Sequence, residues 1–510
     1  MQPATSLEEL KERIDLFLLG LRHPILTEPG REVMDLSTSR YSLSTEYQKL
    51  LWHVWNEQTN FVRQITGIQK ETAGRMELRF QKFGKGPPGT LILAESRAAV
   101  EQVARRSQRV RYTQTLRRFL AQLFPQWKVE ELTSEAKLDQ SFSGRYARGL
   151  LRRGARAWAV IGSGEQEDPS AAEGILTYGL VWLDWLRRRN PGRVIEGLKI
   201  FVPPDTAATT LQRLAWMDPA VTRWEVYETG EELRLCDPAD AGNWKTSLPP
   251  LAEPIPRPRS VQRWIERMEA LSPVLESRYG SDGFREWSVR GLPFAKETVP
   301  GLVFGTGRSE TVLEEQTFPA LQRLVEKLLR FRRPQSPDPQ HPLFRLLPER
   351  WMQSLLVRQI PLLGYDLVPG AVYEQVPAVS GTERGLMDLL TVSSQGRLAV
   401  VELKASEDIH LPLQALDYWM RVHWHQERGE FQRLRYFGGR LLSPEPPLLL
   451  LVSPALQFHP SCETVPRYFS PAIEVVRIGL NEKWREECQV VFRLTRIPKL
   501  NGDFEFRTEF

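Results

Sequence analysis

The chain has 510 residues, more than one ordinary hydrophobic core accommodates, so roughly two to four domains are expected. Its composition, 41% hydrophobic and 26% charged without a low-complexity tract, is typical of a folded globular protein and argues against a disordered one. The net charge of +5 is mild and has the sign that an anionic partner favours, while three scattered cysteines argue against a disulfide framework, a structural zinc or an iron–sulfur cluster.

The amino terminus shows no targeting pattern. Residues 1–24 lack a basic segment followed by an apolar one and have instead the spacing of an amphipathic helix. The most apolar run of the chain, PPLLLLVSP around Leu449, is far shorter than the roughly 20 residues that a membrane span needs. We therefore expect a cytoplasmic protein without membrane contact, and a reducing cytoplasm also suits three unpaired cysteines.

The first half, residues 1–245, is predicted to be an α/β domain. A helix and a strand are expected in RFLAQLFPQWKVEEL (118–132), and a strand, a helix and a strand follow in AWAVIG, GILTYGLVWLDWLRRR and LKIFVPP. Four arginine clusters accompany these elements and the later chain, at 105–111, 148–156, 187–189 and 330–333. Taken singly, each cluster is more typical of a solvated helix face than of a phosphate contact.

Two proline-rich breaks divide the remainder. The segment SLPPLAEPIPRPRS predicts an extended linker over 246–262, because each proline fixes φ and removes a donor. A second break at 332–342 separates an accessory strand and helix segment, 263–340, from a final domain, 341–510.

The final domain is predicted to have the order α-β-β-β-α-β with one further strand. The helix lies in PERWMQSLLVRQI, and a strand follows in AVYEQVPAV; a hairpin spans Gly385–Ala405, and a helix covers LQALDYWMRVHWHQERG. The last strands are PLLLLVSP and IEVVRIGL. This order predicts a layered α/β core whose sheet is partly antiparallel at the hairpin.

The two halves resemble each other, which suggests a tandem duplication. Aligning AVI (159–161) with AVV (399–401) places Gly162 and Gly164 at the positions of Glu402 and Lys404, and Tyr178 at that of Tyr418. Upstream, residues 78–93 would correspond to 287–308. The alternative is that many α/β units share helix and strand spacing.

The hairpin carries three charged residues in an otherwise apolar sequence. Strand alternation places Glu402 and Lys404 on one face, and a three-residue turn at Ser394–Gly396 places Asp388 opposite Glu402. Opposed residues have Cβ atoms roughly 4.5–5.5 Å apart, so the two carboxylates would raise one pKa or bind a cation such as Mg²⁺. Lys404 could stabilise charge on a phosphate, or orient and deprotonate the attacking water. The alternative is a solvated sheet edge.

Three short motifs occur in order on strand, strand and helix: Gly385-Leu-Met-Asp388, Glu402-Leu-Lys404 and Gln414-Ala-Leu-Asp-Tyr418. This order resembles the GxxD, ExK and QxxxY pattern of the PD-(D/E)XK nuclease superfamily, in the branch similar to the nuclease domains of bacterial recombination helicase–nucleases. The resemblance spans Pro348 to Leu480 and implies a restriction-endonuclease-like αβββαβ core.

The resemblance also implies the roles of the site residues. Asp388 and Glu402 would ligate Mg²⁺ or Mn²⁺, Lys404 would be the catalytic lysine, and Gln414 and Tyr418 would line the site. Glu349, on the preceding helix, matches an acid that many members carry there, although a first-turn acid also favours a helix without any such role. The implied activity is metal-dependent hydrolysis of phosphodiester bonds, with DNA as partner in repair, recombination or defence; this chain has no helicase motif, so unwinding would need a partner protein.

The first half departs from the pattern, since glycines replace the ExK pair and no acid falls where Asp388 would be. We expect a degenerate copy that binds no metal and that holds DNA through its arginines or builds an interface. Two alternatives stay open for the whole chain: a catalytically inactive nuclease-fold protein for DNA binding or assembly, and a phosphodiesterase acting on RNA or a nucleotide. Endonuclease or exonuclease action, strand preference and oligomeric state do not follow from the sequence.

Overall fold

The computed structural model describes most of the chain. Outside the described residues are 1–5, 22–23, 29–33, 37–38, 47, 56–59, 73, 82–87, 96, 238–245, 252–255, 281, 300, 307–309, 381–382, 499–503 and 510. The backbone but not the side chain is described at 46, 60–61, 97–107, 138, 377–380, 383–384, 496–498 and 504–509.

The chain forms two compact units, Met1–Arg111 and Tyr112–Phe510. Their boundary lies within helix α2 (Arg97–Leu123) and does not coincide with the linker predicted at 246–262, of which residues 252–255 lie outside the described residues. The second unit therefore contains most of the expected first domain together with the accessory segment and the final domain.

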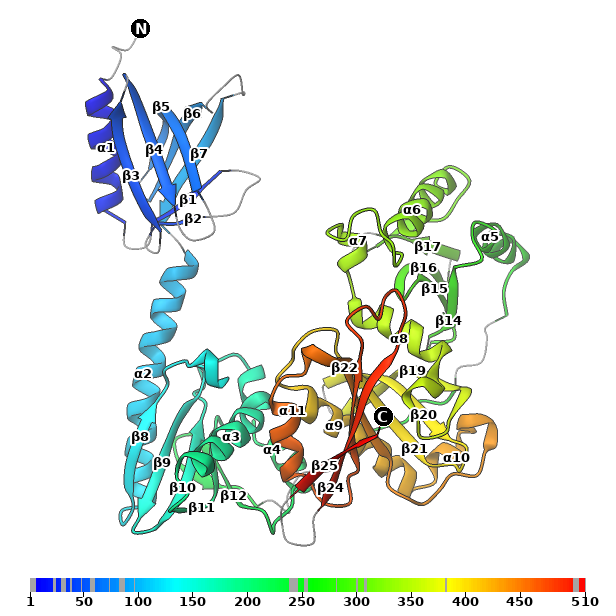
Figure 1. Cartoon of the computed structure of the whole chain (residues 1–510). Helices are drawn as coiled ribbons and strands as arrows, with labels where there is room; N and C mark the ends of the chain where they lie inside the picture. The colour runs from blue at the N-terminus through cyan, green and yellow to red at the C-terminus, as the bar shows by residue number, and fades with distance from the viewer. Residues whose placement is uncertain are drawn as a thin grey trace. The chain divides into compact units, whose positions relative to one another are not determined.

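The first unit is an antiparallel sheet with helix α1 (Leu7–Leu19) packed on it (Figure 1). The helix begins with a capping box, in which Ser6 and Glu9 each bond the other's backbone N–H, and its Leu10, Ile14 and Leu18 are buried against the sheet because they recur at helical spacing. The strand order is β2-β1-β7-β6-β5-β4-β3. The bounds are β1 Pro24–Thr27, β2 Met34–Asp35, β3 Arg40–Glu46, β4 Lys49–Trp55, β5 Asn60–Thr72, β6 Arg75–Gln81 and β7 Gly89–Glu95.

The second unit begins with an α/β sheet in the order β13-β12-β11-β10-β9-β8. Strands β8, β9 and β10 are antiparallel neighbours, β10, β11 and β12 are parallel, and β13 is antiparallel to β12. The bounds are β8 Lys128–Thr133, β9 Ala147–Arg153, β10 Arg156–Gly162, α3 Ser170–Arg189, β11 Val194–Val202, α4 Ala208–Leu214, β12 Arg223–Thr229 and β13 Leu233–Leu235.

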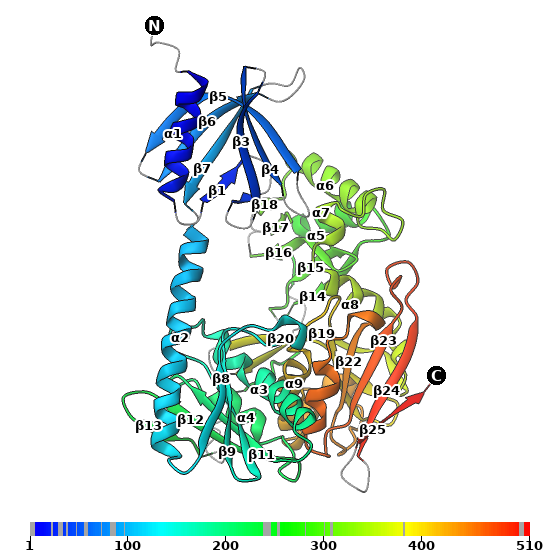
Figure 2. The same ribbon diagram turned by 60° about the vertical axis from the view of Figure 1, so that its left-hand side comes forward.

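An accessory antiparallel sheet follows, with two helices packed against it around Trp287 and Phe294 (Figure 2). Its five strands follow one another in sequence order. The bounds are α5 Arg259–Glu269, β14 Glu276–Tyr279, β15 Arg285–Val289, β16 Leu292–Thr298, β17 Gly301–Phe304, β18 Thr311–Val312, α6 Phe318–Phe331 and α7 Pro342–Arg345.

The last part of the chain is a second α/β sheet in the order β19-β20-β21-β22-β23-β24-β25. Helix α8 (Pro348–Arg358) covers one face and α9 (Leu411–Glu427) the other. The strands are β19 Leu367–Ser380, β20 Glu383–Ser393, β21 Leu398–Leu403, β22 Leu448–Pro454, β23 Val475–Leu480, β24 Val490–Pro498 and β25 Phe504–Glu509, and the short helices are α10 Glu430–Arg433 and α11 Ser461–Thr464. The predicted helix, three strands, helix and two strands are all present, while β24 and β25 were not predicted.

The two α/β sheets have the same connectivity over their first five strands. In each sheet the first three strands, β8–β10 or β19–β21, pair antiparallel, and the next two, β11 and β12 or β22 and β23, run parallel to the third. A helix, α3 or α9, connects the third strand to the fourth. The proposed counterparts 78–93 and 287–308 each include an antiparallel hairpin, β6–β7 and β16–β17, although residues 82–87 and 307–308 lie outside the described residues.

The two α/β sheets share one hydrophobic core. Its buried residues come from α3 and α9 and from strands of both sheets. Trp216 packs edge-on against Trp419 with ring centroids 4.8 Å apart, and a backbone bridge joins Met217 to Phe469. The molecule is thus mixed α/β, and one face of the first α/β sheet packs in the shared core while residues of α2 pack on its other face. Among the described residues, no helix is long and apolar enough to cross a membrane.

Candidate active site

The hairpin β20–β21 has the predicted turn. Ser393 N–H donates to the carbonyl of Arg397 at 2.8 Å, and Gly396 adopts φ +85°, where a side chain would be strained. The ladder runs from Val392↔Leu398 to Leu389↔Val401, and the same register continued by one residue places Asp388 opposite Glu402. The residues of the turn, Ser394–Gly396, were therefore sufficient to predict which residues of β20 and β21 pair.

The faces of the hairpin also follow strand alternation. Leu398 and Val400 pack in the core on the α9 side, whereas Ala399 and Val401 pack on the α8 side. Glu402 has the same parity as Val400 and so faces α9. The acid pair and the helix that carries Gln414 and Tyr418 are consequently on the same side of the sheet.

The two carboxylates lie in a buried environment. Glu402 is 4% exposed, and its Oε2 has no hydrogen-bond partner among the described residues. Burial and the nearby Asp388 raise the pKa of Glu402 well above its ordinary value. Asp388 accepts hydrogen bonds from Leu403 N–H at 2.9 Å and from the Gln375 amide at 3.2 Å, and burial raises its pKa despite these bonds.

Lys404 lies among acids. Its Nζ is 3.7 Å from Glu402 Oε1 and 3.5 Å from Asp408 Oδ2. Burial by itself lowers the pKa of Lys404, but Glu402 and Asp408 outweigh burial, so the pKa is raised. In this arrangement the lysine is a cation held between two carboxylates.

Two further acids surround the lysine. Glu349, in the first turn of α8, accepts a hydrogen bond from Ala405 N–H at 3.2 Å, so the helix brings this acid to the end of the ExK strand. Asp408 was not predicted. It accepts from His410 N–H at 2.8 Å just before α9 begins, and an Asp three residues before the first residue of a helix is the signal that could have indicated it.

Tyr418 and Gln414 complete the α9 side. A Cβ added at Gly385 would lie 3.1 Å from the Tyr418 ring, which explains why the first motif begins with glycine. Burial, followed by the charges of Glu402 and Asp388, raises the pKa of Tyr418, so its hydroxyl is near both acids. Gln414 Oε1 is buried and has no partner among the described residues. The residues predicted for the site thus come from α8, the hairpin β20–β21 and α9, which meet at one end of the hairpin. They are Glu349, Asp388, Glu402, Lys404, Gln414 and Tyr418.

A chain of side-chain amides behind the acid pair was not predicted. Gln375, in β19, donates to Asp388 and also to Gln353 Oε1 at 2.7 Å, and Gln353 donates to Glu374 at 2.7 Å. Gln375 has φ +49°, an unusual conformation inside a strand. The two adjacent polar residues in VYEQVPAV were the only sequence signal, since one of them must face the interior.

The acid pair is compatible with a hard divalent cation. Among the described residues there is no cluster of three or more His, Cys, Asp or Glu side chains that could hold a metal. Mg²⁺, however, is commonly bound by one or two carboxylates, with water and substrate phosphate supplying the other ligands. The unpartnered Oε2 of Glu402 is a buried acceptor of the kind such an ion would satisfy.

The first α/β sheet has no acids at the equivalent place. Gly162 pairs with Ala147 across β9 and β10, where the second sheet has Glu402 and Asp388. A Cβ added at Gly162 would lie 2.5 Å from the Tyr112 hydroxyl, so a tyrosine from α2 occupies this space. That hydroxyl is buried and has no partner among the described residues, and burial raises the pKa of Tyr112.

These contacts predict opposite effects of two substitutions. Tyr112→Phe removes an unpartnered buried hydroxyl and should leave the free energy of unfolding unchanged or raise it, by up to about 1 kcal/mol. Gly162→Glu, which restores the missing acid, should lower it by several kcal/mol, on the order of 3, because the new side chain overlaps Tyr112 and buries a charge. Urea unfolding monitored by tryptophan fluorescence measures both, and a stable Gly162→Glu protein would contradict the packing described.

Many arginines of the predicted clusters have structural contacts. Arg148 bonds the carbonyls of Ser143 and Glu135, Arg187 bonds those of Ile195 and Val221, and the fully buried Arg332 bonds five backbone carbonyls. These three guanidinium groups therefore have backbone acceptors within the protein. The side chains of 105–107 lie outside the described residues.

Comparison with known proteins identifies no family for this chain. No protein-family model matches the chain, and no curated protein matches it at a significant level.

Proposed function

We propose that the second α/β sheet is a metal-dependent nuclease domain with a restriction-endonuclease-like core, and that it hydrolyses phosphodiester bonds, in the first instance in DNA. The observation that carries the proposal is the meeting of Asp388, Glu402 and Lys404 on one buried face with Gln414 and Tyr418 opposite. Such a set of opposed carboxylates and a lysine suits a phosphate and a cation better than it suits a structural core.

The roles follow from the contacts. Asp388 and Glu402 would hold Mg²⁺ or Mn²⁺, which supplies positive charge for the phosphate and lowers the pKa of a bound water. Gln375 and Leu403 N–H fix the orientation of Asp388. Lys404 stabilises negative charge on the phosphate, and water displaces the leaving oxygen, giving the 5′-phosphate and 3′-hydroxyl that the family resemblance implies. The proposal includes a cytoplasmic location and, for duplex unwinding, a separate helicase partner.

The test is cleavage of end-labelled linear DNA, circular DNA and RNA in Mg²⁺ or Mn²⁺, with EDTA as the metal-free condition. We expect cleavage that EDTA abolishes and that Asp388→Asn reduces at least about 100-fold, whereas the exposed Asp139→Asn leaves it unchanged. Loss of circles identifies endonuclease action, and cleavage of RNA alone reassigns the substrate.

A second candidate is a nuclease-fold protein that binds nucleic acid without cutting it. The observation in its favour is that, within the described part of the chain, no more than two of the ligand-type side chains converge closely enough to hold an ion. Absence of cleavage with every substrate and metal, together with retained DNA binding, would establish it.

A further inference from the structure

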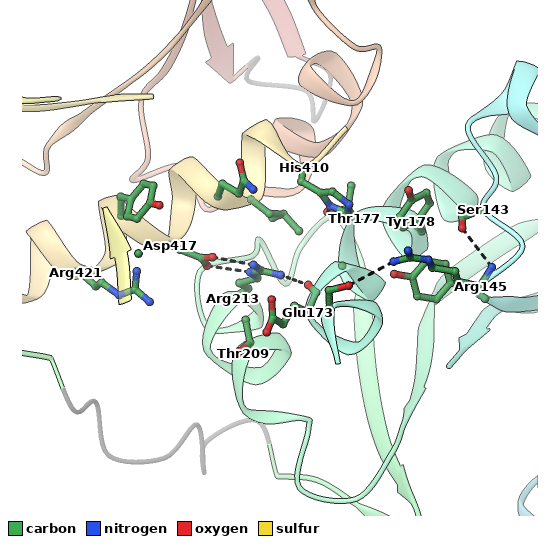
Figure 3. Close-up of a pocket in the computed structure, with 17 residues that line it drawn as sticks. Ser143, Arg145, Glu173, Thr177, Tyr178, Thr209, Arg213, His410, Asp417 and Arg421 are labelled. Atoms are coloured by element: carbon green, nitrogen blue, oxygen red, sulfur yellow. Dashed lines mark hydrogen bonds and ion pairs between the residues drawn. The ribbon is translucent and has the colours of Figure 1, made fainter. Parts of the chain in front are cut away.

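A cavity of about 420 Å³ lies between α3 of the first α/β sheet and α9 of the second (Figure 3). The first sheet contributes Arg145 and Tyr178, and the second contributes Gln414, Tyr418 and Arg421. Both α/β sheets therefore build this cavity, although only the second has the acid pair.

The cavity reaches the candidate active site. Gly385 lines it and precedes Asp388 by three residues on β20, which corresponds to about 10 Å along a strand. Tyr418, which is near both acids, and Gln414 also line it. Asp388 and Glu402 are not among the lining residues, so a chain lying in the cavity would pass Tyr418 to reach them.

The polar lining favours an anion. The cations Arg145, Arg213 and Arg421 outnumber the acids Glu173 and Asp417, and Arg213 and Asp417 are paired with each other. Arg145 is exposed, and within the described part of the chain its guanidinium donates one long hydrogen bond, to Ser170 Oγ at 3.4 Å, while Arg421 Nε is buried without a partner there. The first turns of α3 and α9 also form part of the wall, which adds the positive ends of two helix dipoles.

The aromatic lining favours a base. Tyr178 is partly exposed and rests on Tyr146 with ring centroids 4.8 Å apart, and its ring meets the edge of His410 at 5.5 Å. Successive bases stack on such rings in grooves that are positively charged. The volume is in the range of a small-ligand pocket and is too small for a duplex about 20 Å across, so it suits one or two unpaired nucleotides.

We propose that this cavity binds an unpaired polynucleotide segment and that the first α/β sheet, through Arg145 and Tyr178, presents the strand to the acids of the second. The presentation of the strand for cleavage rests on the proposed nuclease function, whereas the binding of the strand does not. The first α/β sheet, which lacks the acid pair, would hold the substrate through residues that line the cavity and not through its arginine clusters.

Fluorescence anisotropy tests the binding of the strand. The probes are labelled 12-nucleotide single strands of DNA and of RNA and a blunt DNA duplex, and EDTA prevents metal-dependent cleavage. We expect tighter binding of a single strand than of the duplex, and Arg145→Glu should weaken it roughly 10-fold and reduce the salt dependence by about one phosphate contact. Tyr178→Leu, which keeps apolar bulk but removes the stacking surface, should weaken it roughly 10-fold as well.

Arg153→Glu is the matched control, because Arg153 is exposed at the opposite end of β9 and should change affinity less than about twofold. Thermal unfolding of each variant separates loss of binding from loss of structure. Preference for the duplex, or wild-type affinity in both Arg145→Glu and a folded Tyr178→Leu, overturns the proposal. Binding without any cleavage would reject the nuclease function alone, and cleavage with KM unaffected by Arg145→Glu would reject the cavity alone.

Discussion

Glu402→Gln is expected to abolish metal-dependent cleavage while the protein stays fully folded. The substitution conserves shape but removes the carboxylate that would hold the ion, and loss of one such charge-stabilising group lowers kcat on the order of 100- to 1000-fold. Because Glu402 is 4% exposed, lies beside Asp388 and has an unpartnered oxygen among the described residues, its neutral replacement should not lower the free energy of unfolding in EDTA. Cleavage rates and urea unfolding of the same preparations measure the two effects.

Lys404→Met is the companion variant, since it removes the cation and keeps much of the side-chain bulk. It should also lose cleavage, whereas the exposed Glu445→Gln should retain the wild-type rate and stability. If Glu402→Gln cuts DNA as fast as the wild type, the acid pair is not the catalytic site. If it unfolds, Glu402 has a structural role that its contacts do not indicate.

Arg213→Met is expected to produce the largest loss of stability, about 3–5 kcal/mol, because it breaks a buried ion pair between the two α/β sheets. Arg213 in α4 is bidentate on Asp417 in α9, with Nε–Oδ1 and Nη2–Oδ2 distances of 2.9 and 2.7 Å. The two side chains are only 7% and 17% exposed, so the variant leaves the Asp417 charge buried and uncompensated. Equilibrium unfolding in urea gives the difference directly.

A double substitution, Arg213→Met with Asp417→Leu, should recover most of this loss, because it removes the uncompensated charge as well as the pair. Arg188→Met removes a guanidinium that is 68% exposed from Asp184, which is 11% exposed and keeps a second cation, Arg467, at 3.9 Å; it should change stability by less than about 1 kcal/mol. Equal effects of Arg188→Met and Arg213→Met would contradict the assigned burial of the Arg213–Asp417 pair.

Local patterns in the hairpin were sufficient for much of the candidate site. A glycine at the third turn position set the register, and period-two alternation then placed Glu402 and Lys404 on the face toward α9. These hairpin patterns do not include Gln375 or Asp408, which lie outside the hairpin and reach the site through a positive φ within β19 and a turn before α9. The catalytic roles of all these residues remain predictions.

Sequence patterns alone predicted the element order of the second α/β sheet, the opposition of Asp388 and Glu402, and the glycines at the equivalent place in the first. These features depend on residues close in sequence, where turn chemistry and side-chain periodicity act. Three features are seen only in the folded molecule: the two α/β sheets share a core, Tyr112 fills the space beside Gly162, and Arg145 and Tyr178 form one cavity with Tyr418. Those contacts join residues that are far apart in sequence or, for Tyr112 and Gly162, a helix and a strand, and packing selects among many pairings that local patterns allow equally.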